Sequence, residues 1–195
     1  MTQKNKAYHI SILAMFIAVI IIQNFIPLFG YIPLGLLDLT TIHITVIIAA
    51  IILGPRDGAL VGGVWGLITF IRAFTSPTSP LAPLVFTNPV VSIVPRVLIG
   101  VVAGWLFIWL QHKIKRTPAM MVAALAGALI NTLLVLGLIY LFYRTPAVAK
   151  AYGTADISRL GGLLLVVVGT NGIPEAILAA IVAPLICTPL LRFRK

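Results

Sequence analysis

The sequence predicts an all-α integral membrane protein whose single transmembrane domain, residues 1–195, is a bundle of six membrane-spanning helices. Hydrophobic residues make up 61% of the chain, and its mean hydropathy is +1.13. Charged residues make up only 9%, whereas soluble domains carry about a quarter. The apolar residues also fall in blocks close to the roughly 20 residues that cross a hydrocarbon core of about 30 Å. This composition excludes both an ordinary soluble domain and a disordered chain.

Six segments approach the length of a membrane span, at residues 8–28, 39–54, 57–74, 89–111, 118–143 and 163–191. The first follows Lys4 and Lys6, as in a signal peptide, but its length and the lack of a small-residue cleavage pattern predict an uncleaved span. The second and third are short, and Gly54, Pro55, Arg56 and Asp57 separate them. These four residues predict a tight turn that breaks the helix. A count of five spans, with one of these two segments merged or dropped, is the main alternative.

The basic residues predict the orientation of the chain, because cytoplasmic loops are enriched in lysine and arginine. With the N-terminus inside, the outer loops hold only Arg144, Lys150 and Arg159. The inner segments hold Lys4, Lys6, Arg56, Lys113, Lys115, Arg116, Arg192, Arg194 and Lys195. We therefore expect a multi-pass protein of the cell membrane with both termini in the cytoplasm. Most of the net charge of +10 reflects this topology rather than a surface for nucleic acid.

Small residues recur at every fourth position in four of the spans, and such stripes let membrane helices approach closely. For the third, fourth and fifth spans we predict packing inside the bundle. The first span is otherwise bulky, so its pair could pack internally or contact a partner subunit. The stripes are Ala14 and Ala18; Gly58, Gly62 and Gly66; Gly100 and Gly104; and Ala123 and Gly127.

The outer connections differ from the short, basic inner ones. Residues 29–38 and 75–89 mix proline and glycine with apolar side chains, which is expected of loops that fold over a cavity. Residues 144–162 are more polar, and we expect them to be exposed. The asymmetry predicts a small-molecule site on the outer side.

Polar side chains within a membrane are costly, so each is a candidate for function. At a rise of about 1.5 Å per residue, Thr69, Arg96, Asn131 and Asn171 reach a similar depth, roughly 10 Å below the outer surface. The planar guanidinium of Arg96 suits a carboxylate or a phosphate. Arg96 could instead pair with Glu175, which is the only acidic residue well inside a span.

Other candidates have an ordinary structural role beside the functional one. Asn88 precedes Pro89, so its first interpretation is a helix cap and its second is a ligand contact. Trp65 is either core or a pocket wall. His43 has no partner at metal-ligand spacing, so no metal site is predicted. For Asn171 we favour ligand contact, since the nearby Pro174 permits a kink that exposes backbone.

No enzyme motif is present, and four acidic residues and one cysteine leave little for catalysis or a metal cluster. We expect no cofactor in this chain and no ATP site, so an energy source must belong to another subunit. A small membrane enzyme or an autonomous channel is the alternative from a different class.

The chain resembles the S components of energy-coupling factor (ECF) vitamin transporters, and within them the pantothenate type. The resemblance covers essentially the whole chain and rests on the six short spans, the alanine pair of the first span and the apolar outer loops. The most specific stretches are IHITVIIAAIILGPRDGA at 42–59, GGVWG at 62–66, FTNP at 86–89 and PRVLIG at 95–100.

The resemblance implies a subunit that captures a vitamin at the outer face, with Ala14 and Ala18 docking on a transmembrane coupling protein. Two cytoplasmic ATPases would use ATP and Mg²⁺. For pantothenate, we expect Arg96 to bind the carboxylate while Asn88, Asn131 and Asn171 bind the amide and hydroxyl groups. Trp65, Thr69 and His43 complete the expected substrate site. Hydroxymethylpyrimidine and pyridoxine are the alternative substrates.

Overall fold

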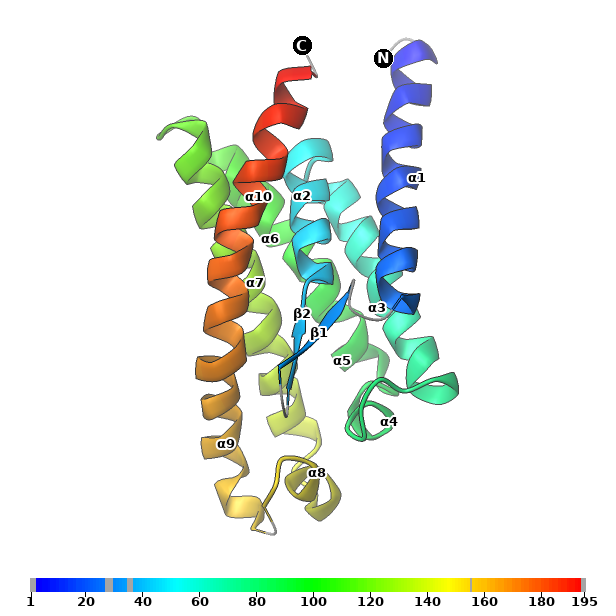
Figure 1. Ribbon diagram of the computed structural model, residues 1–195, viewed down its shortest axis with the longest axis vertical. Coiled ribbons are helices and arrows are strands. Elements are labelled where there is room, and N and C mark those ends of the chain that lie inside the picture. The colour runs from blue at the N-terminus through cyan, green and yellow to red at the C-terminus, as the bar shows by residue number, and fades with distance from the viewer. Residues whose placement is uncertain (1–2, 27–29, 35–36, 155, 194–195) are drawn as a thin grey trace.

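The computed structural model describes residues 3–26, 30–34, 37–154 and 156–193. Figure 1 shows a bundle of roughly parallel helices with both ends of the chain at the same end of the molecule. Within the described residues, five helical segments are long and apolar enough to cross a membrane. They contain the helices α1 (Gln3–Phe25), α3 (Pro55–Thr75), α6 (Val94–Leu110), α7 (Arg116–Phe142) and α10 (Ile173–Phe193). The prediction of a helical, multi-pass membrane protein is confirmed.

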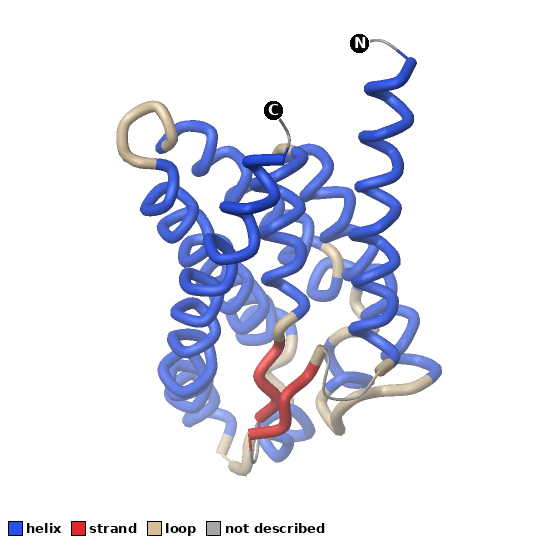
Figure 2. The backbone as a smooth tube through the Cα atoms, turned by 45° about the horizontal axis from the view of Figure 1, so that its top comes forward, coloured by secondary structure: helices blue, strands red, loops and turns tan. Residues whose placement is uncertain are grey.

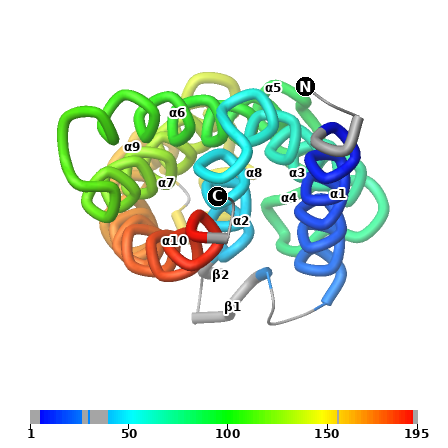
Figure 3. The backbone as a smooth tube through the Cα atoms, turned by 90° about the horizontal axis from the view of Figure 1, so that it is seen from above, coloured from blue at the N-terminus to red at the C-terminus, as the bar shows by residue number. Residues whose placement is uncertain are grey.

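The remaining predicted span, the second at residues 39–54, contains a short helix in the centre of the bundle. This helix, α2 (Ile42–Leu53), has 12 residues, all of which are buried except the last. Seen from above, it is enclosed by α1, α3, α6, α7 and α10 (Figure 3). Twelve helical residues extend about 18 Å, well short of a hydrocarbon core of about 30 Å. Protein rather than lipid therefore surrounds α2 along its length.

The break between α2 and α3 lies where the sequence predicts it. Gly54 has a φ of 110°, a conformation that favours glycine, and Pro55 is the first residue of α3. The two helices therefore reverse direction with a single residue between them.

A short β-hairpin, which is not among the elements predicted from the sequence, precedes α2. Strands β1 (Tyr31–Leu34) and β2 (Leu37–Thr40) are antiparallel, with Tyr31 opposite Thr40 (Figure 2). The second predicted span, 39–54, therefore begins within the hairpin, because residues 39 and 40 belong to β2. Alternating apolar and polar residues in a four-residue strand are too few to distinguish it from the start of a span.

Helices α3 and α6 pack closely because of their glycines. A Cβ atom at Gly62 would lie 2.1 Å from the Arg96 carbonyl oxygen, and one at Gly100 would lie 2.1 Å from the Gly58 carbonyl carbon. Gly104 approaches Pro55 in the same way. The predicted internal packing of these two stripes is confirmed, and it fixes the backbone at Arg96 against α3.

Short helices gather at the end of the bundle away from the termini (Figure 1). Most of the described residues in 144–162 are exposed, as predicted, although Val148, Ala149 and Leu160 of this region are buried. The segments are α4 (Ala82–Val85), α5 (Pro89–Ser92), α8 (Pro146–Ala151), η1 (Ile157–Arg159) and α9 (Leu160–Val167). A π-helical turn, η2 (Val168–Gly172), connects α9 to α10.

Candidate functional site

A cavity of about 300 Å³ lies at the end of the bundle that carries α4 and α8. Its volume is at the lower limit of pockets that hold small organic ligands. Its walls come from α3, α6, α7, η2, α10, the end of β2 and the segment 77–82. The polar side chains among its lining residues are Thr40, Trp65, Thr69, Arg72, Thr78, Ser79, Arg96, Asn131, Thr132, Tyr152, Asn171 and Glu175.

Arg96 is held in place by the break between α5 and α6. Pro95 has no N–H group, so the carbonyl four residues earlier, that of Val91, receives no helical hydrogen bond from it. The Arg96 Nη1 atom donates to this carbonyl at 2.8 Å. The guanidinium carbon lies 5.2 Å from the centre of the Trp65 ring and 5.0 Å from that of Phe86. A side chain only 6% exposed thus presents a fixed positive charge to the cavity.

Among the lining residues other than Arg96, three polar atoms are buried without a hydrogen-bond partner in the described part of the chain. They are the Trp65 Nε1 and Arg72 Nε donors and the Asn131 Oδ1 acceptor. Buried polar groups are nearly always hydrogen-bonded, so these atoms can bond to a polar molecule that enters the cavity.

Asn171 reaches the cavity through the irregular end of the last span. In the π-helical turn η2, the N–H group of Ile173 donates to the Val168 carbonyl, five residues earlier. Pro174 cannot donate at all, which removes the next helical bond. A Cβ atom at Gly172 would lie 2.8 Å from Thr132 Cγ2, so glycine lets this turn approach α7. Single π turns are often found at functional sites.

Glu175 lines the same cavity, one turn beyond Asn171. Its Oε1 atom accepts a hydrogen bond of 2.6 Å from the backbone N–H of Thr40. The acid considered as an internal partner for Arg96 therefore holds the end of β2.

The structure brings five of the seven predicted substrate residues together. Trp65, Thr69, Arg96, Asn131 and Asn171 all line the cavity, and the last four are those that the sequence places at one depth. His43 and Asn88 do not line it. His43 is buried in α2. Asn88 caps α5, its Oδ1 atom accepting from Val90 N at 2.9 Å.

Several lining residues were not candidates in the sequence. Phe86 and Tyr152 come from connections, where helical periodicity gives no signal. Burial raises the pKa of Tyr152 to about 12, so its phenol is neutral near pH 7. Arg72 also lines the cavity and donates a hydrogen bond to the Asn24 carbonyl at the end of α1.

The predicted docking residues lie on a different surface. Ala14 and Ala18 are exposed on α1, which is the least buried of the candidate spans. Met15 and Ile22 are also exposed there, at 52% and 48%. The two alanines therefore do not pack inside this bundle.

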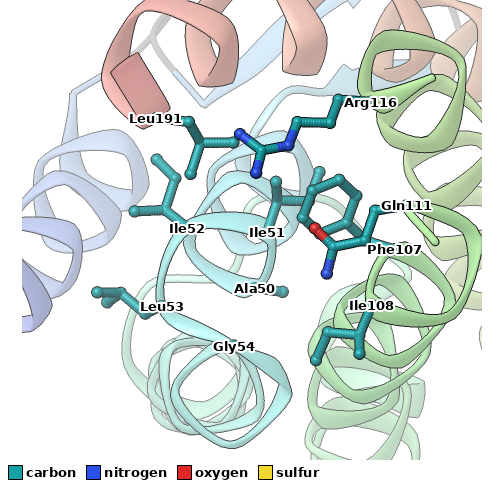
Figure 4. Close-up of a pocket in the computed structure, with 10 residues that line it drawn as sticks. All are labelled: Ala50, Ile51, Ile52, Leu53, Gly54, Phe107, Ile108, Gln111, Arg116 and Leu191. Atoms are coloured by element: carbon teal, nitrogen blue, oxygen red, sulfur yellow. The ribbon is translucent and has the colours of Figure 1, made fainter. Parts of the chain in front are cut away.

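A second cavity, of about 400 Å³, lies between the ends of α2, α6 and α10 near the chain termini (Figure 4). Arg116 and Gln111 are its polar side chains, and the other lining residues, such as Ile51, Phe107 and Leu191, are apolar or glycine. Arg116 is exposed. This cavity lacks the clustered buried polar groups of the first one. Within the described residues, no group of three His, Cys, Asp or Glu side chains is placed to hold a metal ion.

The family model for the substrate-specific component of ECF transporters matches residues 9–187. The chain belongs to this family. Members are transporter subunits rather than enzymes, and the prediction of a non-enzymatic S component is confirmed.

Two relatives of this S component are named for the same vitamin. The pantothenic acid transporter PanT of Lactococcus lactis subsp. cremoris is 33% identical over 209 aligned positions, covering 99% of this chain and 98% of the relative. The pantothenate transporter PanT of Leuconostoc mesenteroides is 42% identical over 135 residues, or 66% of each protein. The crystal structure of an S component for biotin from an ECF-type ABC transporter has a TM-score of 0.62. It covers 96% of this chain and 95% of its own, and at 16% identity it supports the fold alone.

Proposed function

We propose that this S component binds pantothenate in the cavity around Arg96 and delivers it to an ECF transporter. The observation that carries the proposal is a permanent cation, buried in a small cavity beside an unmatched donor on Trp65 and an unmatched acceptor on Asn131. The names of the two relatives support the same substrate.

The chemistry of the cavity suits this vitamin. Pantothenate has one carboxylate, one amide, two hydroxyl groups and a gem-dimethyl group. Arg96 would bind the carboxylate, while Asn131, Asn171 and the Trp65 indole would bind the amide and hydroxyl groups. Val135, Leu136 and other apolar lining residues would contact the methyl groups. Hydroxymethylpyrimidine and pyridoxine carry no carboxylate and would leave Arg96 without an anionic partner.

We further propose that the cavity faces the outside of the cell and that the termini are cytoplasmic. The excess of basic residues at the end carrying the termini supports this orientation. The exposed small patch at Ala14 and Ala18 would contact the transmembrane coupling protein. Partner ATPases would supply ATP hydrolysis with Mg²⁺, and no cofactor is proposed in this chain.

Calorimetric titration of the purified protein with pantothenate tests the substrate and the role of Arg96. We expect Arg96→Ala to weaken binding by about 100-fold, because it removes the buried partner of the carboxylate. The matched control is Arg159→Ala, whose side chain is 79% exposed and outside the cavity. Pyridoxine and hydroxymethylpyrimidine are titrated in parallel. Wild-type affinity in Arg96→Ala would contradict the role of Arg96. Tighter binding of pyridoxine or hydroxymethylpyrimidine would show that pantothenate is not the preferred substrate.

A further inference from the structure

Arg72, near the end of α3, lines the same cavity as Arg96 and also contacts the end of α1. Its Nη1 atom donates a hydrogen bond to the Asn24 carbonyl, and its guanidinium carbon lies 5.5 Å from the centre of the Phe25 ring. Helix α1 ends at Phe25, and the last carbonyls of a helix have no donor within the helix. One N–H group of Arg72 therefore caps α1.

The capping contact does not use the whole guanidinium group. The Nε atom of Arg72 is buried and has no hydrogen-bond partner among the described residues. An arginine carries five N–H donors in one rigid plane, so it can cap a helix and donate to a second acceptor at once. A buried donor without a partner is costly, and anchoring α1 does not require it. Because Arg72 lines the cavity, a polar ligand can supply the second acceptor.

Arg72 and Arg96 contact the cavity at different levels. The Arg96 guanidinium carbon lies 5.2 Å from the centre of the Trp65 ring, and Trp65 precedes Arg72 by seven positions on α3. Seven positions make about two helical turns, so both side chains lie on one face of α3, roughly 10 Å apart along its axis. Thr69, between them on this face, lines the cavity as well. An elongated ligand can therefore lie along α3 with one end at each arginine.

Pantothenate has the length to reach both arginines. Its carboxylate and its terminal hydroxyl group are as far apart as the ends of about three extended residues, roughly 10 Å. We infer that Arg72 is a second substrate-binding residue, whose Nε–H group donates to the terminal hydroxyl group while Arg96 binds the carboxylate. The inference rests on the proposed function, which places the carboxylate at Arg96.

The assignment gives Arg72 a role in selectivity. A site that donates a hydrogen bond to one hydroxyl group discriminates against an analogue without that group, because the buried donor is then left unmatched. Arg72 thus selects a ligand by the position of an acceptor at the end opposite to its carboxylate.

Two analogues, each changed at one end of pantothenate, test this orientation. Pantothenol has an alcohol in place of the carboxylate, and 4′-deoxypantothenate lacks the terminal hydroxyl group. We expect calorimetry to show that the wild type binds 4′-deoxypantothenate about tenfold more weakly than pantothenate, as for one hydrogen bond to a charged group. In Arg72→Ala the two ligands should bind equally, while the preference for pantothenate over pantothenol should remain.

A purely structural role for Arg72 predicts a different result. Loss of the α1 cap alone would weaken all three ligands by the same factor and leave the tenfold preference over 4′-deoxypantothenate intact in Arg72→Ala, which would overturn the inference. Equal binding of pantothenate and 4′-deoxypantothenate by the wild type would overturn it too. So would loss of the preference over pantothenol in Arg72→Ala, which would place the carboxylate at Arg72.

Two further variants complete the test. Arg144→Ala removes an exposed arginine that also lies over an aromatic ring, that of Tyr140, but is outside the cavity, so it should match the wild type with all three ligands. Arg72→Lys keeps a cation for the Asn24 carbonyl but has no Nε–H group. It should unfold at the wild-type temperature and still lose the preference over 4′-deoxypantothenate.

The same titrations separate this inference from the proposed function. If the wild type binds none of the three ligands, the proposed function fails and the role of Arg72 with it. If the wild type binds pantothenate and the two Arg72 variants keep its preference over 4′-deoxypantothenate, only the role of Arg72 fails.

Discussion

Proline shapes the proposed binding site at the scale of single residues. Pro95 leaves the Val91 carbonyl without its helical donor, and Arg96 fills that place. Pro174 follows the π-helical turn that carries Asn171 to the cavity. At both positions proline cannot donate a helical hydrogen bond. The resulting irregularity lies beside a polar side chain that lines the cavity.

Trp65 permits a test of whether the unmatched indole N–H serves the ligand. We expect Trp65→Phe to keep the aromatic contact with Arg96 but to weaken pantothenate binding about fivefold, the value of one hydrogen bond of about 1 kcal/mol. Because the variant removes a buried donor that has no partner in the described residues, the thermal stability of the empty protein should not fall. Calorimetry and thermal unfolding measure the two effects.

The control for this variant is Trp109→Phe, which changes an exposed tryptophan on α6 outside the cavity. It should leave pantothenate affinity unchanged. If Trp65→Phe binds pantothenate as tightly as the wild type, the indole N–H makes no hydrogen bond to the ligand.

The site was predictable from the sequence to the extent that it depends on depth. The constant rise of a helix places Thr69, Arg96, Asn131 and Asn171 in one layer, and all four line the cavity. Depth says nothing about rotation around the helix axis or about neighbouring helices. From depth alone, therefore, His43 could not be distinguished from a residue that lines the cavity, although it lies inside a helix that is buried on all sides. Phe86 and Tyr152 lie in irregular connections, which show no helical periodicity.

At the scale of elements, the packing of α3 against α6 holds the backbone of Arg96 in place. We expect Gly62→Ala to destabilise the protein by about 2 kcal/mol or more and to weaken pantothenate binding, since the new methyl group would collide with the Arg96 carbonyl. Gly137→Ala in α7 is the matched control, as nothing lies within 4 Å of a Cβ atom there.

We expect the two glycine variants to behave oppositely in thermal unfolding and calorimetry. Alanine favours a helix over glycine by about 1 kcal/mol, so Gly137→Ala should be neutral or stabilising. A Gly62→Ala protein as stable and as tight-binding as the wild type would show that α3 and α6 can separate without disturbing Arg96.

At the scale of the whole molecule, the cavity and the exposed alanine patch occupy separate surfaces. We therefore expect Ala14→Trp to abolish co-purification with the coupling protein while leaving pantothenate affinity unchanged. Leu133→Trp, at an exposed position of α7, is the control and should retain the partner. Loss of the partner in both variants, or in neither, would count against docking through α1.

The orientation in the membrane can be tested with added cysteines, because the native Cys187 is buried. A membrane-impermeant maleimide applied to intact cells should label Lys150→Cys, in α8, and not Lys113→Cys, between α6 and α7. The reverse pattern would place the cavity on the cytoplasmic side.

The short central helix has a consequence for how the protein is made. Helix α2 emerges from the ribosome before α6, α7 and α10, which later surround it. A 12-residue apolar helix is too short to be held across a bilayer by its own contacts with lipid. Since one residue joins it to α3, we expect the two to enter the membrane as a pair. During synthesis α2 therefore depends on α3 for its position, and its remaining side chains are covered only when the second half of the chain has been inserted.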